Sequence, residues 1–128
     1  TLSLHDALPI SLIFGAIVTN LLLKNIVARP RPFAEIEALI PMITKPKDFS
    51  FPSGHTTASF AVALVMLRML PKKIGIPAVV LAALVAFSRL YLGVHYPTDV
   101  LTGFVIALVG SMLSVWIVRT KPEDKQVH

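Results

Sequence analysis

Long apolar segments alternate with short polar connections along this chain. Four segments are almost free of charge, at residues 7–23, 56–70, 74–88 and 100–118. A helix that crosses a bilayer needs about 20 predominantly apolar residues, within a range of about 17 to 25. The last segment meets that length alone, whereas the second needs its flanking turns or a tilt. The pattern predicts an all-α protein, a transmembrane helical bundle with four spanning helices.

The polar connections indicate where the helices end. Residues 24–50 form a long polar stretch with four prolines, and the first helix is predicted to end at Arg29–Pro32 because proline cannot continue a helix. Residues 71–73 form a tight basic turn. Residues 95–99 form a short break, and Pro97 suits the first turn of the fourth helix, where its missing N–H costs nothing. Residues 119–128 form a polar tail.

Three polar clusters lie at ends of the predicted helices. They are Lys24 with Arg31, Ser53 with His55, and Arg89 with His95 and Asp99. Because successive helices run in opposite directions, all three clusters are predicted to meet at one membrane face. An active site requires such convergence of side chains from distant segments.

Composition narrows the choice of environment and partner. Apolar residues make up 55% of the chain and charged residues 15%, and the mean hydropathy is +0.75. A soluble domain carries about 25% charged residues, so these values favour lipid as the solvent. The formal net charge of +5 suits nucleic acid, anionic lipid or a phosphorylated substrate. We expect no nucleic acid, because the basic residues form no continuous polar face.

The residue types in the clusters suit phosphate chemistry. Arginine offers a planar fork of hydrogen-bond donors that fits a phosphate. The alternative for each of the cations Lys24, Arg31 and Arg89 is membership of a basic belt whose side chains reach lipid headgroups. Ser53 is a good helix N-cap, and Gly54 lets a ligand approach a helix start that attracts anions. His95 and Asp99 are four residues apart, so a carboxylate can orient the imidazole and leave its other nitrogen for attack.

Metal chemistry and thiol chemistry are not expected. The chain has no cysteine, which excludes thiol nucleophiles and disulfides. Of seven carboxylates, only Asp99 stands at a helix boundary beside other candidate residues, and a two-metal phosphatase needs several clustered oxygen ligands. We therefore predict that catalysis uses neither a metal ion nor another cofactor.

Taken in order, the three clusters resemble the signature of the type-2 phosphatidic acid phosphatase and vanadium haloperoxidase superfamily. Its pattern is K-x6-RP, then PSGH, then SR-x5-H-x3-D, and residues 24–32, 52–55 and 88–99 match it without departure. The resemblance implies phosphate binding by Lys24, Arg31, Ser53, Gly54 and Arg89. It implies that His95 attacks phosphorus to form a phosphohistidine, that Asp99 orients His95, and that His55 protonates the leaving oxygen and then helps to activate water.

The resemblance also bears on domain organisation. Membrane members of the family generally have six helices, so residues 1–128 are interpreted as one membrane phosphatase domain, a fragment that lacks its N-terminal part. Its first residues do not read as a signal peptide, because no basic region and no cleavage site are present. Residues 1–10 are a candidate foreign segment.

The predicted function is metal-independent hydrolysis of a lipid phosphate or diphosphate in the membrane. Isoprenyl diphosphate is the favoured substrate, and phosphatidylglycerol phosphate and phosphatidate are the others. One alternative is a haloperoxidase, which the apolar composition disfavours. Another is a fragment of a channel or transporter, which vanadate would not inhibit. No protein partner is indicated.

The basic residues also suggest an orientation. Each face holds six of the twelve lysines and arginines, and setting aside Lys24, Arg31 and Arg89 leaves three on the site face. The basic turn at residues 71–73 and the tail then mark the cytoplasm. We therefore predict a bacterial plasma membrane protein whose site faces outward.

Overall fold

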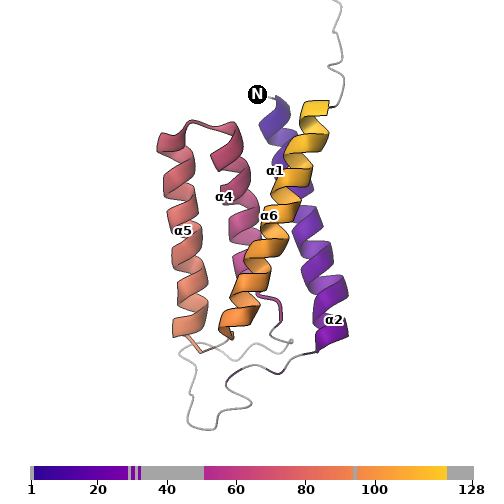
Figure 1. The fold of residues 1–128 in the computed structure, drawn as a ribbon, viewed down its shortest axis with the longest axis vertical. Coiled ribbons are helices and arrows are strands. Elements are labelled where there is room, and N and C mark those ends of the chain that lie inside the picture. The colour runs from indigo at the N-terminus through magenta and orange to yellow at the C-terminus, as the bar shows by residue number, and fades with distance from the viewer. Residues whose placement is uncertain (1, 29, 31, 33–50, 94, 121–128) are drawn as a thin grey trace, which may run out of the picture.

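The computed structural model describes residues 2–28, 30, 32, 51–93 and 95–120. The first helical rod consists of α1 (Leu2–Ala16), a π-helical segment η1 (Ile17–Leu23) and α2 (Lys24–Val27). Three further helices follow, α4 (Gly54–Met69), α5 (Lys72–Tyr91) and α6 (Pro97–Thr120). Figure 1 shows these helices side by side in alternating directions, as the apolar segments predicted.

The helix ends follow the local signals in the sequence. The first rod ends at Val27, before the Arg-Pro repeat, and Ala28 closes it in a left-handed conformation with φ of 49°. Ser53 caps α4 by accepting a hydrogen bond from the Thr56 N–H at 3.4 Å. Pro97 is the first residue of α6. The predicted roles of Ser53 and Pro97 in starting helices are therefore confirmed.

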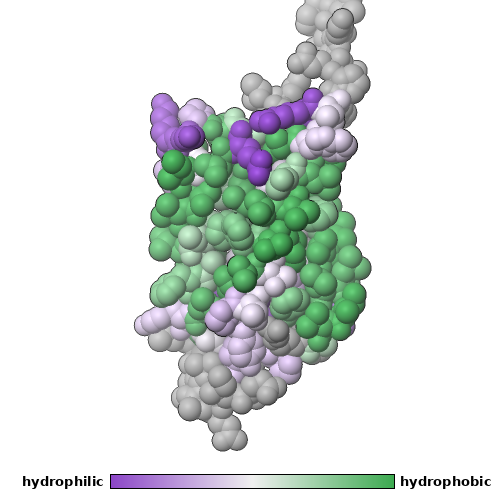
Figure 2. Space-filling view, in the orientation of Figure 1, coloured by the Kyte–Doolittle hydropathy of each residue, from purple (hydrophilic) through white to green (hydrophobic). Residues whose placement is uncertain are grey.

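Three of these helices are long and apolar enough to cross a membrane. They span Leu4–Val27, Lys72–Tyr91 and Pro97–Thr120. Helix α4 has 16 residues and falls short of that length, as its short apolar segment predicted. Large apolar side chains such as Leu21 (66% exposed) and Trp116 (63% exposed) face outward. Figure 2 shows a broad apolar surface band between more hydrophilic ends, which suits contact with lipid.

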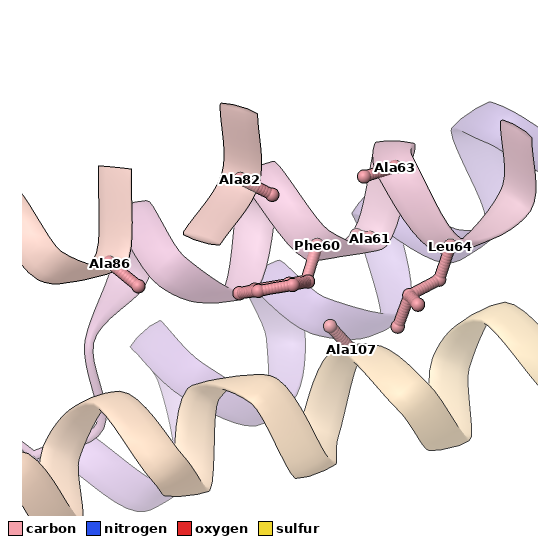
Figure 3. Packing of buried hydrophobic residues seen from close by; sticks show 7 residues of the cluster. All are labelled: Phe60, Ala61, Ala63, Leu64, Ala82, Ala86 and Ala107. Carbon is pink, nitrogen blue, oxygen red and sulfur yellow. The ribbon is translucent and has the colours of Figure 1, made fainter. Parts of the chain in front are cut away.

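Helix α4 occupies the centre of the bundle and packs against α1, α5 and α6, whereas α5 barely touches α6. The core between α4, α5 and α6 is built mainly from small side chains: Phe60, Ala61, Ala63, Leu64, Ala82, Ala86 and Ala107 (Figure 3). Small residues let helix backbones approach closely, which drives helix packing in a membrane. The rings of Phe60 and Phe104 meet edge to face, with centroids 4.8 Å apart.

Buried hydroxyl groups join the first rod to α4. Ser11 Oγ donates to the Ala61 carbonyl at 3.0 Å, and Thr19 Oγ1 donates to Thr57 Oγ1 at 3.2 Å. Thr57 Oγ1 in turn donates to the Ser53 carbonyl at 2.8 Å. Hydrogen bonds between helices contribute to packing where no water competes. This chain of bonds fixes the start of α4 relative to the first rod.

The π-helical segment changes which side chains face α4. In η1 the Lys24 N–H donates to the Thr19 carbonyl, five residues earlier. In an α-helix, residues five apart point about 140° away from each other. The wider π-turn brings them nearly onto one face. Thr19 and Lys24 are both buried, so the π-segment directs both side chains toward the interior.

Candidate active site

The predicted site residues lie at one end of the bundle, where the first rod and α5 end and α4 and α6 begin (Figure 1). The described members are Lys24, Ser53, Gly54, His55, Arg89, His95 and Asp99. Arg31 lies outside the described residues. The structure therefore brings together residues from all three sequence clusters, as the alternating directions of the helices require.

Lys24 lies beside the first residue of α4. A Cβ atom built on Gly54 would stand 3.9 Å from Lys24 Nζ, so the absence of a side chain leaves this backbone open toward the ammonium group. Lys24 is only 8% exposed. The start of a helix carries partial positive charge on its first N–H groups. A buried cation next to that helix start forms a site with strong preference for an anion.

His95 and Asp99 form a buried pair next to this anion site. His95 Nδ1 lies 3.5 Å from Asp99 Oδ2, and the side chains are 1% and 0% exposed. Asp99 Oδ2 also accepts a hydrogen bond from the Tyr96 N–H at 2.7 Å, which holds the carboxylate in place. Because Nδ1 faces the carboxylate, Nε2 lies on the opposite edge of the ring. The spacing argument that His95 and Asp99 meet is confirmed.

A direct backbone contact ties this pair to the start of α4. The Ser53 N–H donates to the Asp99 carbonyl at 3.0 Å, so the first turn of α6 is attached to the N-cap of α4. Gly103 makes the approach possible, since a Cβ atom there would stand 2.9 Å from the Ser53 carbonyl oxygen and 3.0 Å from Thr57 Oγ1. The relative positions of His95 and Gly54 therefore depend on this close packing of α6.

Gly103→Ala is expected to damage the site more than the same change at Gly110. The added methyl group at Gly103 meets backbone at Ser53, whereas at Gly110 it meets the Phe14 ring, 2.7 Å away, which can rotate. Overpacking costs about 1–3 kcal/mol, so we expect about tenfold or greater loss of activity for Gly103→Ala and less than about threefold for Gly110→Ala. Phosphate release in detergent measures the activity of the two variants, and thermal unfolding measures their stability. Equal losses of activity in the two variants would contradict this account.

Arg89 and His55 complete the described set. Arg89 lies in the last turn of α5 and is 9% exposed. A largely buried arginine at a membrane boundary is costly and generally serves an anionic group. His55 is the second residue of α4 and is exposed. Its position directly after Gly54 gives an acid–base group access to a ligand bound at the helix start.

Sequence reasoning missed three features of this end of the bundle. These are the π-segment, the close approach at Gly103 and the polar side chain of Asn20, whose Oδ1 would lie 3.8 Å from a Cβ atom on Gly54. Asn20 was visible as a polar residue inside an apolar run. Gly103 carried no distinctive local signal. Among the described residues, no group of three or more His, Asp or Glu side chains is arranged to hold a metal ion.

Comparison with known proteins identifies similar sequences. The model of the PAP2 superfamily matches residues 7–123. An undecaprenyl-diphosphatase of Sulfolobus acidocaldarius is 38% identical over 86% of this chain and 53% of its own. An undecaprenyl-diphosphatase of Bacillus subtilis is 41% identical over 74% of this chain and 48% of its own. Phosphatidylglycerophosphatase B of Bacillus subtilis is 40% identical over 81% of this chain and 54% of its own.

A solved structure shares the fold. The crystal structure of a transmembrane PAP2-type phosphatidylglycerolphosphate phosphatase from Bacillus subtilis superimposes with a TM-score of 0.73 and 30% sequence identity. The match covers 92% of this chain and 60% of that one. The present chain spans about half the length of the curated relatives named above. This match and the three long apolar helices show that the chain is an integral membrane protein segment.

Proposed function

This chain belongs to the PAP2 superfamily, and on that premise we propose that it hydrolyses a lipid phosphate or lipid diphosphate through a phosphohistidine. The observation that carries the proposal is the buried His95–Asp99 pair, attached by backbone to the helix start where Lys24 lies. A nucleophile held by a carboxylate next to an anion site is what phosphoryl transfer to histidine needs.

In the first step, the phosphoryl group binds between Lys24, Arg89 and the Gly54 N–H, with Ser53 and Arg31 as further ligands. His95 Nε2 attacks phosphorus while the bond from phosphorus to the leaving oxygen breaks. His55 gives its proton to that oxygen. Asp99 stabilises the positively charged phosphohistidine, and the cations offset charge on the transferring oxygens.

In the second step, a water molecule occupies the position that the leaving group has vacated. His55, now without its proton, accepts a proton from this water as the oxygen attacks phosphorus. The bond between phosphorus and His95 Nε2 breaks, inorganic phosphate leaves, and both histidines return to their starting states. The same side chain thus acts first as acid and then as base, and no residue is consumed.

The proposed substrate is an isoprenyl diphosphate. Two of the similar proteins are named as undecaprenyl-diphosphatases, and phosphatidylglycerol phosphate is the second candidate because another is a phosphatidylglycerophosphatase. The protein is proposed to reside in a bacterial plasma membrane with the site facing outward. Lys72, Lys73 and Arg119 lie at the opposite end of the bundle, which suits the cytoplasmic side.

Activity is expected to persist within about twofold in excess EDTA, because Asp99 is the one carboxylate at the site among the described residues and a metal pair needs several. The assay measures phosphate released by the full-length protein in detergent from undecaprenyl diphosphate, phosphatidylglycerol phosphate and phosphatidate. The proposal is supported if kcat/KM is higher for undecaprenyl diphosphate than for the other two lipids. Loss in EDTA with recovery in magnesium would contradict the mechanism, and no release from any of the lipids would contradict the function.

A further inference from the structure

The first helical rod presents a second polar side chain to the start of α4. A Cβ atom on Gly54 would stand 3.8 Å from Asn20 Oδ1 and 3.9 Å from Lys24 Nζ. Asn20 and Lys24 therefore flank the same backbone, one from within the π-segment and one from its end. The ligand that Lys24 and Gly54 bind also comes within reach of the Asn20 amide.

Among the residues that the structure describes, no hydrogen bond accounts for an amide at Asn20. Asn20 is exposed, inside a membrane-spanning helix, between Ile17 and Leu21, which are also exposed. A polar group without a hydrogen bond is costly in lipid, and polar residues there generally serve function. Asn25, also exposed, donates to the Leu21 carbonyl at 3.2 Å. Within the described ranges, Asn20 makes no comparable bond.

The position of Asn20 along the helix identifies which part of a substrate it meets. Asn20 lies one turn before Lys24, on the side of the bilayer interior. A lipid substrate places its terminal phosphate at Lys24 and its hydrocarbon tail in the bilayer. Between them lies the leaving group, which is a second phosphate in a lipid diphosphate.

We propose that Asn20 is a substrate-binding residue that donates an amide hydrogen bond to the leaving phosphate of a lipid diphosphate. The assignment rests on the proposed function and deepens it, because it specifies what selects the substrate. A neutral amide donates two hydrogen bonds through Nδ2 without adding charge next to Lys24, and a half-turn of the Asn20 amide brings Nδ2 to the place of Oδ1 beside Gly54. It therefore favours an oxygen-rich leaving group at that position over an aryl leaving group, which offers no phosphate oxygens.

Asn20→Leu in the full-length protein tests this assignment, with Asn25→Leu as the matched control on the same rod. A hydrogen bond to a charged group, once removed, corresponds to about 10–100-fold in rate. We expect kcat/KM for undecaprenyl diphosphate to fall by that factor in Asn20→Leu, while kcat/KM for p-nitrophenyl phosphate changes less than about threefold. Asn25→Leu is expected to leave both substrates within about twofold of wild type.

A second variant tests whether the effect of Asn20→Leu comes from loss of the amide or from a change in packing. Asn20→Ser removes the amide without adding apolar bulk, and it is expected to show the same split between the two substrates. An equal fall on both substrates would overturn the assignment to the leaving group, and no fall on either would overturn binding by Asn20. Wild type that releases no phosphate from either substrate would overturn the proposed function first, before any variant is compared.

Discussion

His95→Ala is expected to abolish turnover with every substrate, because it removes the atom proposed to bond to phosphorus. His95 is buried and its Nδ1 lies 3.5 Å from Asp99 Oδ2, which leaves Nε2 as the nitrogen that the proposed mechanism uses for attack. Loss of a nucleophile eliminates the covalent pathway, so we expect a decrease in kcat of about 10⁴-fold or more. Phosphate release from a lipid diphosphate and from an aryl phosphate measures the loss.

His55→Ala is the matched comparison, because it removes the proposed acid and leaves the proposed nucleophile. General acid catalysis contributes about 10²–10⁴-fold, and less is needed when the leaving group is already acidic. We therefore expect His55→Ala to be impaired on a lipid phosphomonoester and partly rescued by an aryl phosphate, whereas His95→Ala is not rescued.

Trapping the intermediate provides an independent measurement. An acid-labile, base-stable phosphoryl label is expected on wild type and on His55→Ala after brief exposure to labelled substrate, and none on His95→Ala. A label that survives in His95→Ala would mean that another residue is the nucleophile. Equal rescue of both variants by aryl phosphate would mean that the roles of the two histidines are not separate.

Asp99→Asn is expected to lower kcat by about 10²–10⁴-fold while leaving phosphate binding largely intact. The amide nearly matches the carboxylate in size, and its oxygen can still accept from the Tyr96 N–H. That oxygen is also the one that faces His95 Nδ1, but the amide carries no charge, so it cannot stabilise a positively charged His95 as a carboxylate does. The measurements are kcat and the inhibition constant for inorganic phosphate, which reports ground-state binding.

Asp99 is buried within the fold, so the stability of its variants must be measured beside their activity. Its fully buried side chain accepts from the Tyr96 N–H, and Asp99→Ala removes that acceptor, so this variant is expected to lose thermal stability as well as activity. Asp99→Asn is expected to melt close to wild type. Binding of inorganic phosphate that weakens in Asp99→Asn as much as turnover would contradict the proposed role and indicate that Asp99 holds the site together.

Local physics explains what could be predicted from the sequence. The apolar segments predicted the helices because their length matches the membrane, and prolines marked where helices stop or start. The cap at Ser53 and the meeting of His95 with Asp99 depend on spacings of three and four residues, which a helix start fixes without help from the rest of the fold. The candidate histidines, Lys24 and Arg89 followed from the same pattern, because alternating helices carry their ends to one side.

The tertiary structure decided how those ends fit together. In a regular α-helix Thr19 and Lys24 would lie on different faces. The π-turn directs both inward, and Thr19 then bonds to Thr57 of α4. The bond from Ser53 to Asp99 joins residues 46 positions apart, and it forms because Gly103 lets two backbones touch. Such contacts depend on the shapes of two distant segments at once, so no local pattern contains them. The place of Asn20 beside Gly54 has the same origin, since it depends on how the first rod turns against α4.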